Sequence, residues 1–290
     1  MAKAPPMGRK PPLYGGKSAH RPAVRDALGA SVDALAAAGV EGPRLDAELL
    51  LGEATGWDRA RLAADPDAGV PADAGRRFGE MVRRRLRREP VAYILGRKGF
   101  RNIELAVDRR VLIPRPETEL LVELALELRP ASVLDVGTGS GAIALAIADE
   151  LPGCEVTATD TSAAALEVAR ANAERLGFSA RARFLEGSAP EGEAFELTVA
   201  NLPYVAEADW PSLQPEVTQW EPREALLAGP DGLDSIRALI PQVRHGALAL
   251  EVGRGQAEPV AALLGDAGFT DIQTRRDLAG IERVVWGRRG

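Results

Sequence analysis

The sequence is poor in the residues that form disulfides or bind metals: it has one cysteine and two histidines among 290 residues. With Cys154 as the single thiol, no internal disulfide can form, which is typical of a reducing cytosol and predicts a cytoplasmic protein. His20 and His245 have no second histidine or cysteine at ligand spacing, so we expect no metal site. No Ser-His or Cys-His pair suited to nucleophilic catalysis is evident along the chain.

Long apolar runs and an excess of positive charge are also missing. No run of about 18 apolar residues occurs, so we expect no membrane span. The basic, Pro- and Gly-rich N-terminus lacks the apolar segment of a secretory signal, and we interpret residues 1–21 as a disordered tail. The net charge of -6 argues against a general nucleic-acid binder.

One stretch departs from this acidic balance. Residues 76–90 carry seven arginines against two glutamates. We interpret the stretch as the solvated face of a helix; a contact surface for RNA or for an acidic protein partner is the alternative.

The first part of the chain has a helical pattern. Val24, Leu28, Val32 and Leu35 recur at a spacing of three to four residues, and Gly and Pro residues separate this helix from later ones. The pattern predicts a small all-helical domain at residues 22–90. At residues 91–115, β-forming residues alternate with polar ones around glycines, which predicts a β-hairpin linker.

Strand and helix patterns alternate through residues 116–290, which predicts an α/β domain with a mostly parallel sheet. The expected strands are residues 132–136, 155–160, 181–187, 196–201, 246–252, 269–277 and 282–289. Only the short "LAG" and its neighbours join the last two, too few residues for a helical crossover. The final strand of this seven-stranded sheet should therefore run antiparallel.

A glycine-rich turn follows the first of these strands. Gly137, Thr138, Gly139, Ser140 and Gly141 read GxGxG, whereas dinucleotide sites usually read GxGxxG. Glycines let the backbone turn tightly and approach a ligand, and the start of the next helix can hold a carboxylate.

Asp160 ends the second strand, where its carboxylate can accept hydrogen bonds from both hydroxyls of a ribose. Together, the turn and this acid predict an adenosine site. The combination resembles the S-adenosylmethionine site of class I methyltransferases, whose Rossmann-like sheet also has an antiparallel last strand.

A second motif, Asn201, Leu202, Pro203 and Tyr204, follows the fourth strand. It is similar to the Asn-Pro-Pro-Tyr motif of methyltransferases that modify nitrogen on a planar group. The Asn201 side chain and the Leu202 carbonyl can accept from the substrate NH₂ and orient it. Pro203 would restrict Leu202 to extended dihedrals, and Tyr204 would offer a ring for packing.

Six segments that occur in order extend the resemblance over residues 22–288. They read "EPVAYILGRKGF", "VLIPRPETELLVE", "VLDVGTGSGAIALAIA", "NLPYV", "EPREALLAGPDGLDSIR" and "RDLAGIERVV". The succession resembles the release factor glutamine methyltransferase family. The resemblance implies a helical substrate-recognition domain, a hairpin linker and a class I methyltransferase domain. It also implies N5-methylation of the glutamine in the Gly-Gly-Gln motif of peptide chain release factors, with S-adenosylmethionine as cofactor.

Two positions depart from the family pattern. Leu202 replaces the usual first proline of the tetrapeptide, although its carbonyl remains. Ser188 and Ala189 stand where the family often presents an acid and an aromatic to the adenine. We nevertheless count Ser188, with Asn201, among the residues expected at the cofactor.

Three alternative functions stay open on the sequence. A ribosomal-protein glutamine methyltransferase would share nearly every motif, and an RNA adenine-N6 methyltransferase could carry Asn-Leu-Pro-Tyr. The acidic charge and the preceding helical domain count against the RNA enzyme, so we expect no sequence-specific nucleic-acid binding. A cofactor-binding scaffold without turnover is disfavoured because Asn201, Pro203 and Tyr204 are all present.

Overall fold

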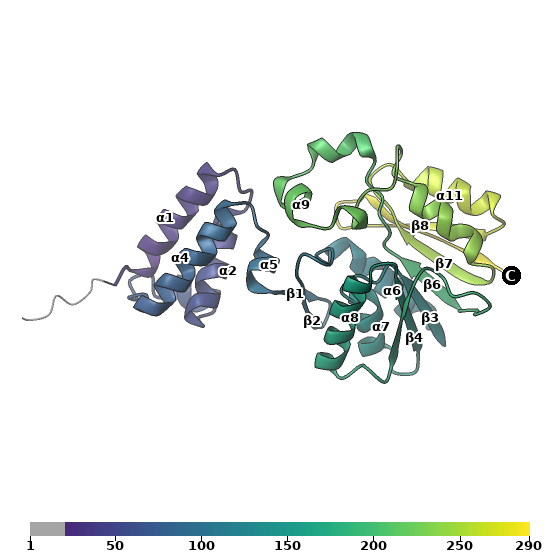
Figure 1. Ribbon diagram of the computed structural model, residues 1–290, viewed down its shortest axis with the longest axis horizontal. Helices are drawn as coiled ribbons and strands as arrows, with labels where there is room; N and C mark the ends of the chain where they lie inside the picture. The colour runs from purple at the N-terminus through teal and green to yellow at the C-terminus, as the bar shows by residue number, and fades with distance from the viewer. Residues whose placement is uncertain (1–20) are drawn as a thin grey trace, which may run out of the picture. The chain divides into compact units, whose positions relative to one another are not determined.

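The computed structural model describes residues 21–290, which form two compact units that divide between Leu86 and Arg87 (Figure 1). The disordered tail expected at residues 1–21, and with it His20, lies almost entirely outside the described residues.

The first unit is helical, as the spacing of its apolar residues predicts. Its helices are α1 (Val24–Ala37), α2 (Pro43–Thr55), α3 (Arg59–Ala64) and α4 (Ala72–Leu86). Leu35 of α1, Leu50 of α2 and Phe78 of α4 are buried and belong to the core of this unit. The basic stretch is only partly a solvated face, because Arg85 is buried and donates to Asp46 at 2.7 Å.

The second unit begins with the segment expected to be a hairpin. A short helix, α5 (Val91–Leu95), comes first and ends at Gly96, whose φ is 71°. The antiparallel strands β1 (Arg97–Phe100) and β2 (Ile103–Ala106) follow. The hairpin is therefore shorter than residues 91–115, and the chain continues to Arg115 without further strands.

The remaining chain forms an α/β sheet with the predicted succession of strands (Figure 1). The strands are β3 (Ser132–Val136), β4 (Glu155–Asp160), β5 (Ala182–Glu186), β6 (Leu197–Ala200), β7 (Gly246–Glu251), β8 (Thr270–Arg276) and β9 (Glu282–Arg289). The helices are η1 (Pro116–Thr118), α6 (Glu119–Leu128), α7 (Ala142–Glu150), α8 (Ala163–Leu176), η2 (Glu207–Ser212), α9 (Pro215–Trp220), η3 (Arg223–Ala225), α10 (Asp234–Leu239), η4 (Ile240–Gln242) and α11 (Ala257–Asp266).

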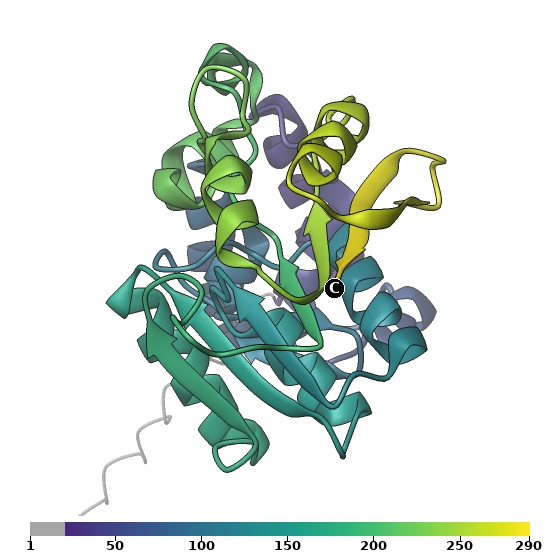
Figure 2. The ribbon, with the colours of Figure 1, turned by 90° about the vertical axis from the view of Figure 1, so that its right-hand side faces the viewer.

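The strand order is β5-β4-β3-β6-β7-β9-β8, and β9 is antiparallel to both of its neighbours. The prediction of an antiparallel final strand is thus confirmed. Figure 2 shows β8 and β9 as a yellow hairpin beside α11, which packs on both strands.

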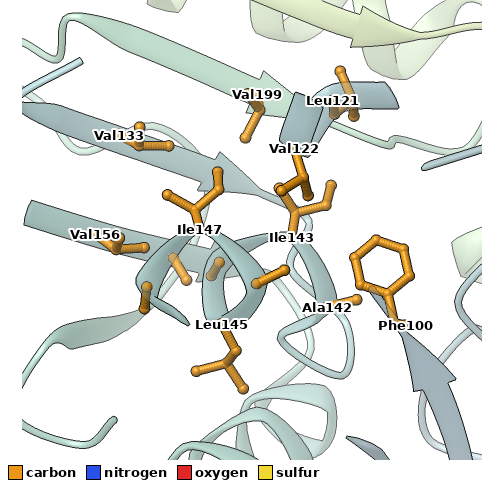
Figure 3. Packing of buried hydrophobic residues seen from close by; sticks show 14 of the residues in the cluster. Phe100, Leu121, Val122, Val133, Ala142, Ile143, Leu145, Ile147, Val156 and Val199 are labelled. Atoms are coloured by element: carbon orange, nitrogen blue, oxygen red, sulfur yellow. The ribbon is translucent and has the colours of Figure 1, made fainter. Parts of the chain in front are cut away.

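Helices cover both faces of the sheet. Val133 of β3 belongs to one apolar core with Ile143 and Ile147 of α7 (Figure 3), whereas Leu134 belongs to a second core with Ile236 of α10. Consecutive residues of this strand therefore pack against helices on opposite faces of the sheet, which explains why "SVLDV" is almost continuously apolar. This double cover holds the carboxyl ends of the strands in fixed positions.

Candidate active site

A cavity of about 420 Å³ lies at the carboxyl ends of β3, β4 and β6. In open α/β sheets this edge is where ligands usually bind. Several residues expected at the site line it: Gly137, Thr138, Gly139, Ser140, Asp160, Ser188, Asn201, Leu202 and Pro203. Gly141 and Tyr204 are not among the lining residues.

The glycine turn adopts a backbone that other residues rarely adopt. Gly137, Gly139 and Gly141 have φ values of 75°, 55° and 85°. A Cβ on Gly137 would lie 3.2 Å from Leu202 Cδ2, so this glycine allows the two loops to approach each other. A Cβ on Gly139 would meet no atom within 4 Å, because Gly139 faces the open cavity.

Asp135 supports this turn from inside the sheet. Its Oδ2 accepts from the Thr138 hydroxyl at 2.7 Å and from the Ala144 N–H at 3.1 Å. The side chain is fully buried, and burial raises its pKa to about 7 despite these two hydrogen bonds. Asp135 was not among the residues predicted from the sequence, although an acid inside an apolar strand two residues before a glycine turn is a visible signal.

Asp160 is fixed against the same turn by backbone donors. Oδ2 accepts from the Gly139 N–H at 2.9 Å, and Oδ1 accepts from the Ser162 N–H at 2.8 Å. Each carboxylate oxygen has a further lone pair and can accept again. The acid is therefore held at the cavity wall with acceptor capacity remaining.

The two halves of the Asn201–Tyr204 segment face different surroundings. Asn201 Nδ2 donates to the Thr118 hydroxyl oxygen at 3.0 Å, and both residues line the cavity. Tyr204 instead donates from its hydroxyl to Glu251 Oε1 at 3.4 Å, and its carbonyl accepts from Gln256 Nε2 at 3.0 Å. The packing role expected of the Tyr204 ring remains a prediction.

The two residues expected near the adenine, Ser188 and Ala189, have different surroundings. Ser188 lines the cavity, whereas Ala189 packs against the second apolar core. No aromatic side chain is among the lining residues, which agrees with the departure noted in the sequence.

The segment before α6 forms a wall that motif spacing alone did not reveal. Leu112, Pro114 and Thr118 line the cavity. The backbone of this segment is tied down by Glu221, which accepts from the Ile113 N–H at 3.1 Å and pairs with the Arg115 guanidinium. The "LIPRPETE" motif therefore contributes both a cavity wall and the partner of Asn201.

Among residues 21–290, no group of three or more His, Cys, Asp or Glu side chains is placed to hold a metal ion. In the region that the structure describes, no helix is long and apolar enough to cross a membrane.

Comparison with known proteins adds relatives that match most of the chain. Family models described as PrmC N-terminal domain and Methyltransferase small domain match residues 26–96 and 116–216. The release factor glutamine methyltransferase of Geobacter sulfurreducens is 44% identical over 266 residues, which cover 88% of this chain and 93% of that protein. The Caulobacter vibrioides protein of the same name is 41% identical over 270 residues, covering 89% and 93%.

A solved structure supports the fold alone. The hMettl16 catalytic domain in complex with MAT2A 3'UTR hairpin 6 has a TM-score of 0.53 and 16% identity, over 63% of this chain and 75% of that one. The class I methyltransferase fold expected from the sequence is confirmed by the strand order and by the methyltransferase family model.

Proposed function

The chain belongs to the release factor glutamine methyltransferase family, and we propose that it methylates peptide chain release factors. The proposed acceptor is the side-chain N5 of the glutamine in their Gly-Gly-Gln motif, and the proposed donor is S-adenosylmethionine. The observation that carries this proposal is the placement of Asn201 and the glycine turn on the walls of one cavity. Because release factors act in translation, we place the reaction in the cytoplasm.

The cavity suits the cofactor in size and in the groups that line it. Its volume of about 420 Å³ is in the usual range for small-molecule sites. Gly139 leaves open space where any other residue would project a side chain, and Asp160 retains acceptor capacity for ribose hydroxyls. We propose that Gly137–Gly141, Asp160, Ser188 and Asn201 hold the cofactor, which supplies an electrophilic methyl group when bound.

The reaction also requires that the substrate amide nitrogen, a weak nucleophile, be correctly oriented. An amide nitrogen has a delocalised lone pair, so its position relative to the methyl carbon strongly affects the rate. The Asn201 Oδ1 and the Leu202 carbonyl would accept from the two N–H groups and stabilise the positive charge that develops on nitrogen. S-adenosylmethionine held by these residues would supply the methyl group to this nitrogen and would leave as the thioether, and the proton that the nitrogen gives up would pass to solvent.

We further propose that residues 22–90 form the domain that recognises the release factor. Residues 22–86 lie in a unit with its own core, whereas every residue lining the candidate cavity belongs to the second unit. Exposed arginines of α4, among them Arg76 and Arg83, offer positive charge to an acidic protein surface.

The test compares substrates directly. Purified release factor, ribosomal protein and ribosomal RNA should be incubated side by side with the enzyme and methyl-labelled S-adenosylmethionine. We expect label in the release factor alone, and none when the glutamine of its Gly-Gly-Gln motif is replaced by alanine. Label in the ribosomal protein or in the RNA, with none in the release factor, would assign the alternative function.

A further inference from the structure

We propose that Gln256 is a positioning residue that holds the Asn201–Tyr204 loop in place from outside the cavity. The inference rests on the proposed function, because it concerns the loop that presents acceptors to the substrate NH₂. Gln256 lies at the start of α11 and is not among the residues that line the cavity. It would therefore act on the reaction only through the loop that it contacts.

The Gln256 side chain makes three hydrogen bonds to backbone groups of three loops. Its Nε2 donates to the Tyr204 carbonyl at 3.0 Å and to the Asp231 carbonyl at 3.3 Å. Its Oε1 accepts from the Gly253 N–H at 2.8 Å. Rotation of the amide by half a turn would place Oε1 against two carbonyl oxygens, so these partners fit only one orientation of the side chain.

The helix that begins at Gln256 does not explain this residue. It occupies the N-cap of α11, where Ser, Thr, Asp and Asn are favoured because their short side chains accept from the first free N–H groups. The longer Gln256 side chain makes no such capping bond. Its polar atoms instead bind Tyr204, Asp231 and Gly253, which indicates that the residue joins loops.

Gly232 leaves the space in which this contact forms. Its φ is 76°, and a Cβ at this position would clash with the Tyr204 carbonyl oxygen and lie 2.8 Å from Gln256 Nε2. A larger residue would therefore push the carbonyl away from its donor. Gly232 belongs to the segment "EPREALLAGPDGLDSIR", and the close approach is a physical reason for glycine at this place in it.

The Asn201–Tyr204 loop is held at both of its ends. Ala200 pairs with β3 and β7 in the sheet, which fixes the start of the loop. The end is fixed at Val205, whose N–H donates to the Leu226 carbonyl at 2.8 Å and whose carbonyl accepts from the Ala228 N–H at 3.0 Å. The position of the loop end therefore depends on where the segment at residues 226–231 lies.

Gln256 fixes both segments relative to the sheet. Its bond to Tyr204 holds the loop, and its bond to Asp231 holds the neighbouring segment, so both are joined to the chain that follows β7. Without the Nε2 donor, the two segments can shift together while their mutual pairing is kept. The Asn201 and Leu202 acceptors would shift with them, and a displacement of about 1 Å at a reacting group can lower the rate about 100-fold.

The experiment removes the donor while retaining the approximate length of the side chain. Gln256→Met should lower kcat for release factor methylation about 10- to 100-fold. Gln256→Glu keeps an acceptor for the Gly253 N–H but, when ionised, has no donor for the two carbonyls, so it should lose at least as much activity.

The readout separates positioning from stability. KM for the release factor and the calorimetric Kd for S-adenosylmethionine should stay within about threefold in both Gln256 variants, because the residues proposed to bind the two substrates do not contact this side chain. The kcat values are normalised to the number of cofactor-binding sites found by calorimetry. A role limited to stability would lower the number of such sites and leave the normalised kcat unchanged.

Gly232→Ala tests the same contact from its other side, because it displaces the Tyr204 carbonyl and leaves Gln256 in the chain. It should lower the normalised kcat about 10-fold or more. Gly280→Ala is its matched control: Gly280 has a φ of 78°, and a Cβ there would meet no atom within 4 Å. The control for the glutamine variants is Gln273→Met, at an exposed position of β8. Both controls should keep the wild-type kcat.

The outcomes distinguish this proposal from the proposed function. If the wild type methylates ribosomal protein or RNA and leaves release factor unlabelled, the proposed function fails, and the same kcat comparison is made with the acceptor that takes the label. The positioning proposal alone is overturned if Gln256→Met or Gln256→Glu has the normalised kcat of the wild type, because the donor bonds would then not matter. If neither glutamine variant folds, equal kcat in Gly232→Ala and Gly280→Ala would overturn it.

Discussion

The buried carboxyl of Asp135 should make the stability of the second unit depend on pH. Its pKa rises from an ordinary value of 3.8 to about 7 on folding, chiefly because burial disfavours the charged form. The folded state therefore keeps a proton that the unfolded state releases. In such a case the free energy of unfolding is highest below the unfolded pKa and decreases as pH rises through the folded pKa.

The expected size follows from the two pKa values. Between pH 6 and pH 8 the unfolded carboxyl is already ionised, while the folded carboxyl ionises midway. The free energy of unfolding should then fall by about 1.4 kcal/mol because of Asp135. Glu251 is also buried and also has its pKa raised to about 7, so the two groups together should cost the wild type roughly 3 kcal/mol over this interval.

Asp135→Asn should remove about half of that decrease. The amide oxygen can still accept from Thr138 and Ala144, and the NH₂ would replace Oδ1, which has no hydrogen-bond partner. The assay is urea unfolding of the cofactor-free chain at pH 6, 7 and 8, followed by tryptophan fluorescence, to which Trp286, buried in the second unit, contributes.

A control neutralises an exposed carboxyl. Asp266→Asn, at the end of α11, should shift stability slightly and leave the pH dependence as in the wild type. The reasoning is refuted if Asp135→Asn and the wild type lose equal stability between pH 6 and pH 8.

Three further predictions concern the cavity and the helical unit. Asp160→Ala should weaken S-adenosylmethionine binding by roughly 1–3 kcal/mol, because ribose hydroxyls lose an acceptor; unchanged calorimetric affinity would remove Asp160 from the site. Leu202→Pro should keep kcat near that of the wild type, since the carbonyl is retained and φ is restricted; a folded but inactive variant would show that this loop differs from that of its relatives. Residues 87–290 alone should bind cofactor but fail to methylate whole release factor; normal methylation by this folded fragment would leave the helical unit a structural role.

The succession of strands, the antiparallel final strand and the glycine turn could be predicted because each depends on residues close together in the sequence. The short "LAG" connection excludes a crossover helix and predicts the antiparallel β9. Likewise, Gly137 and Asp160 occur at the ends of neighbouring strands, so the sheet itself brings them to one edge.

Features that depend on distant contacts escaped the sequence. Thr118 and Asn201 are 83 residues apart, and no local pattern predicts their hydrogen bond. The hydroxyl of Tyr204 points to Glu251, 47 residues away, for the same reason. Arg85, read as part of a solvated face, is buried because Asp46 of α2 pairs with it.

The central claim is that Asn201 presents an acceptor to the glutamine amide of a release factor. Its most direct test is mass spectrometry of release factor after reaction with the wild type and with Asn201→Ala, at saturating S-adenosylmethionine. The account predicts one methyl group on the glutamine of the Gly-Gly-Gln motif, with kcat reduced about 10²- to 10³-fold in Asn201→Ala and cofactor affinity much less affected. Near-normal turnover by Asn201→Ala, or a methyl group on any other residue, would contradict it.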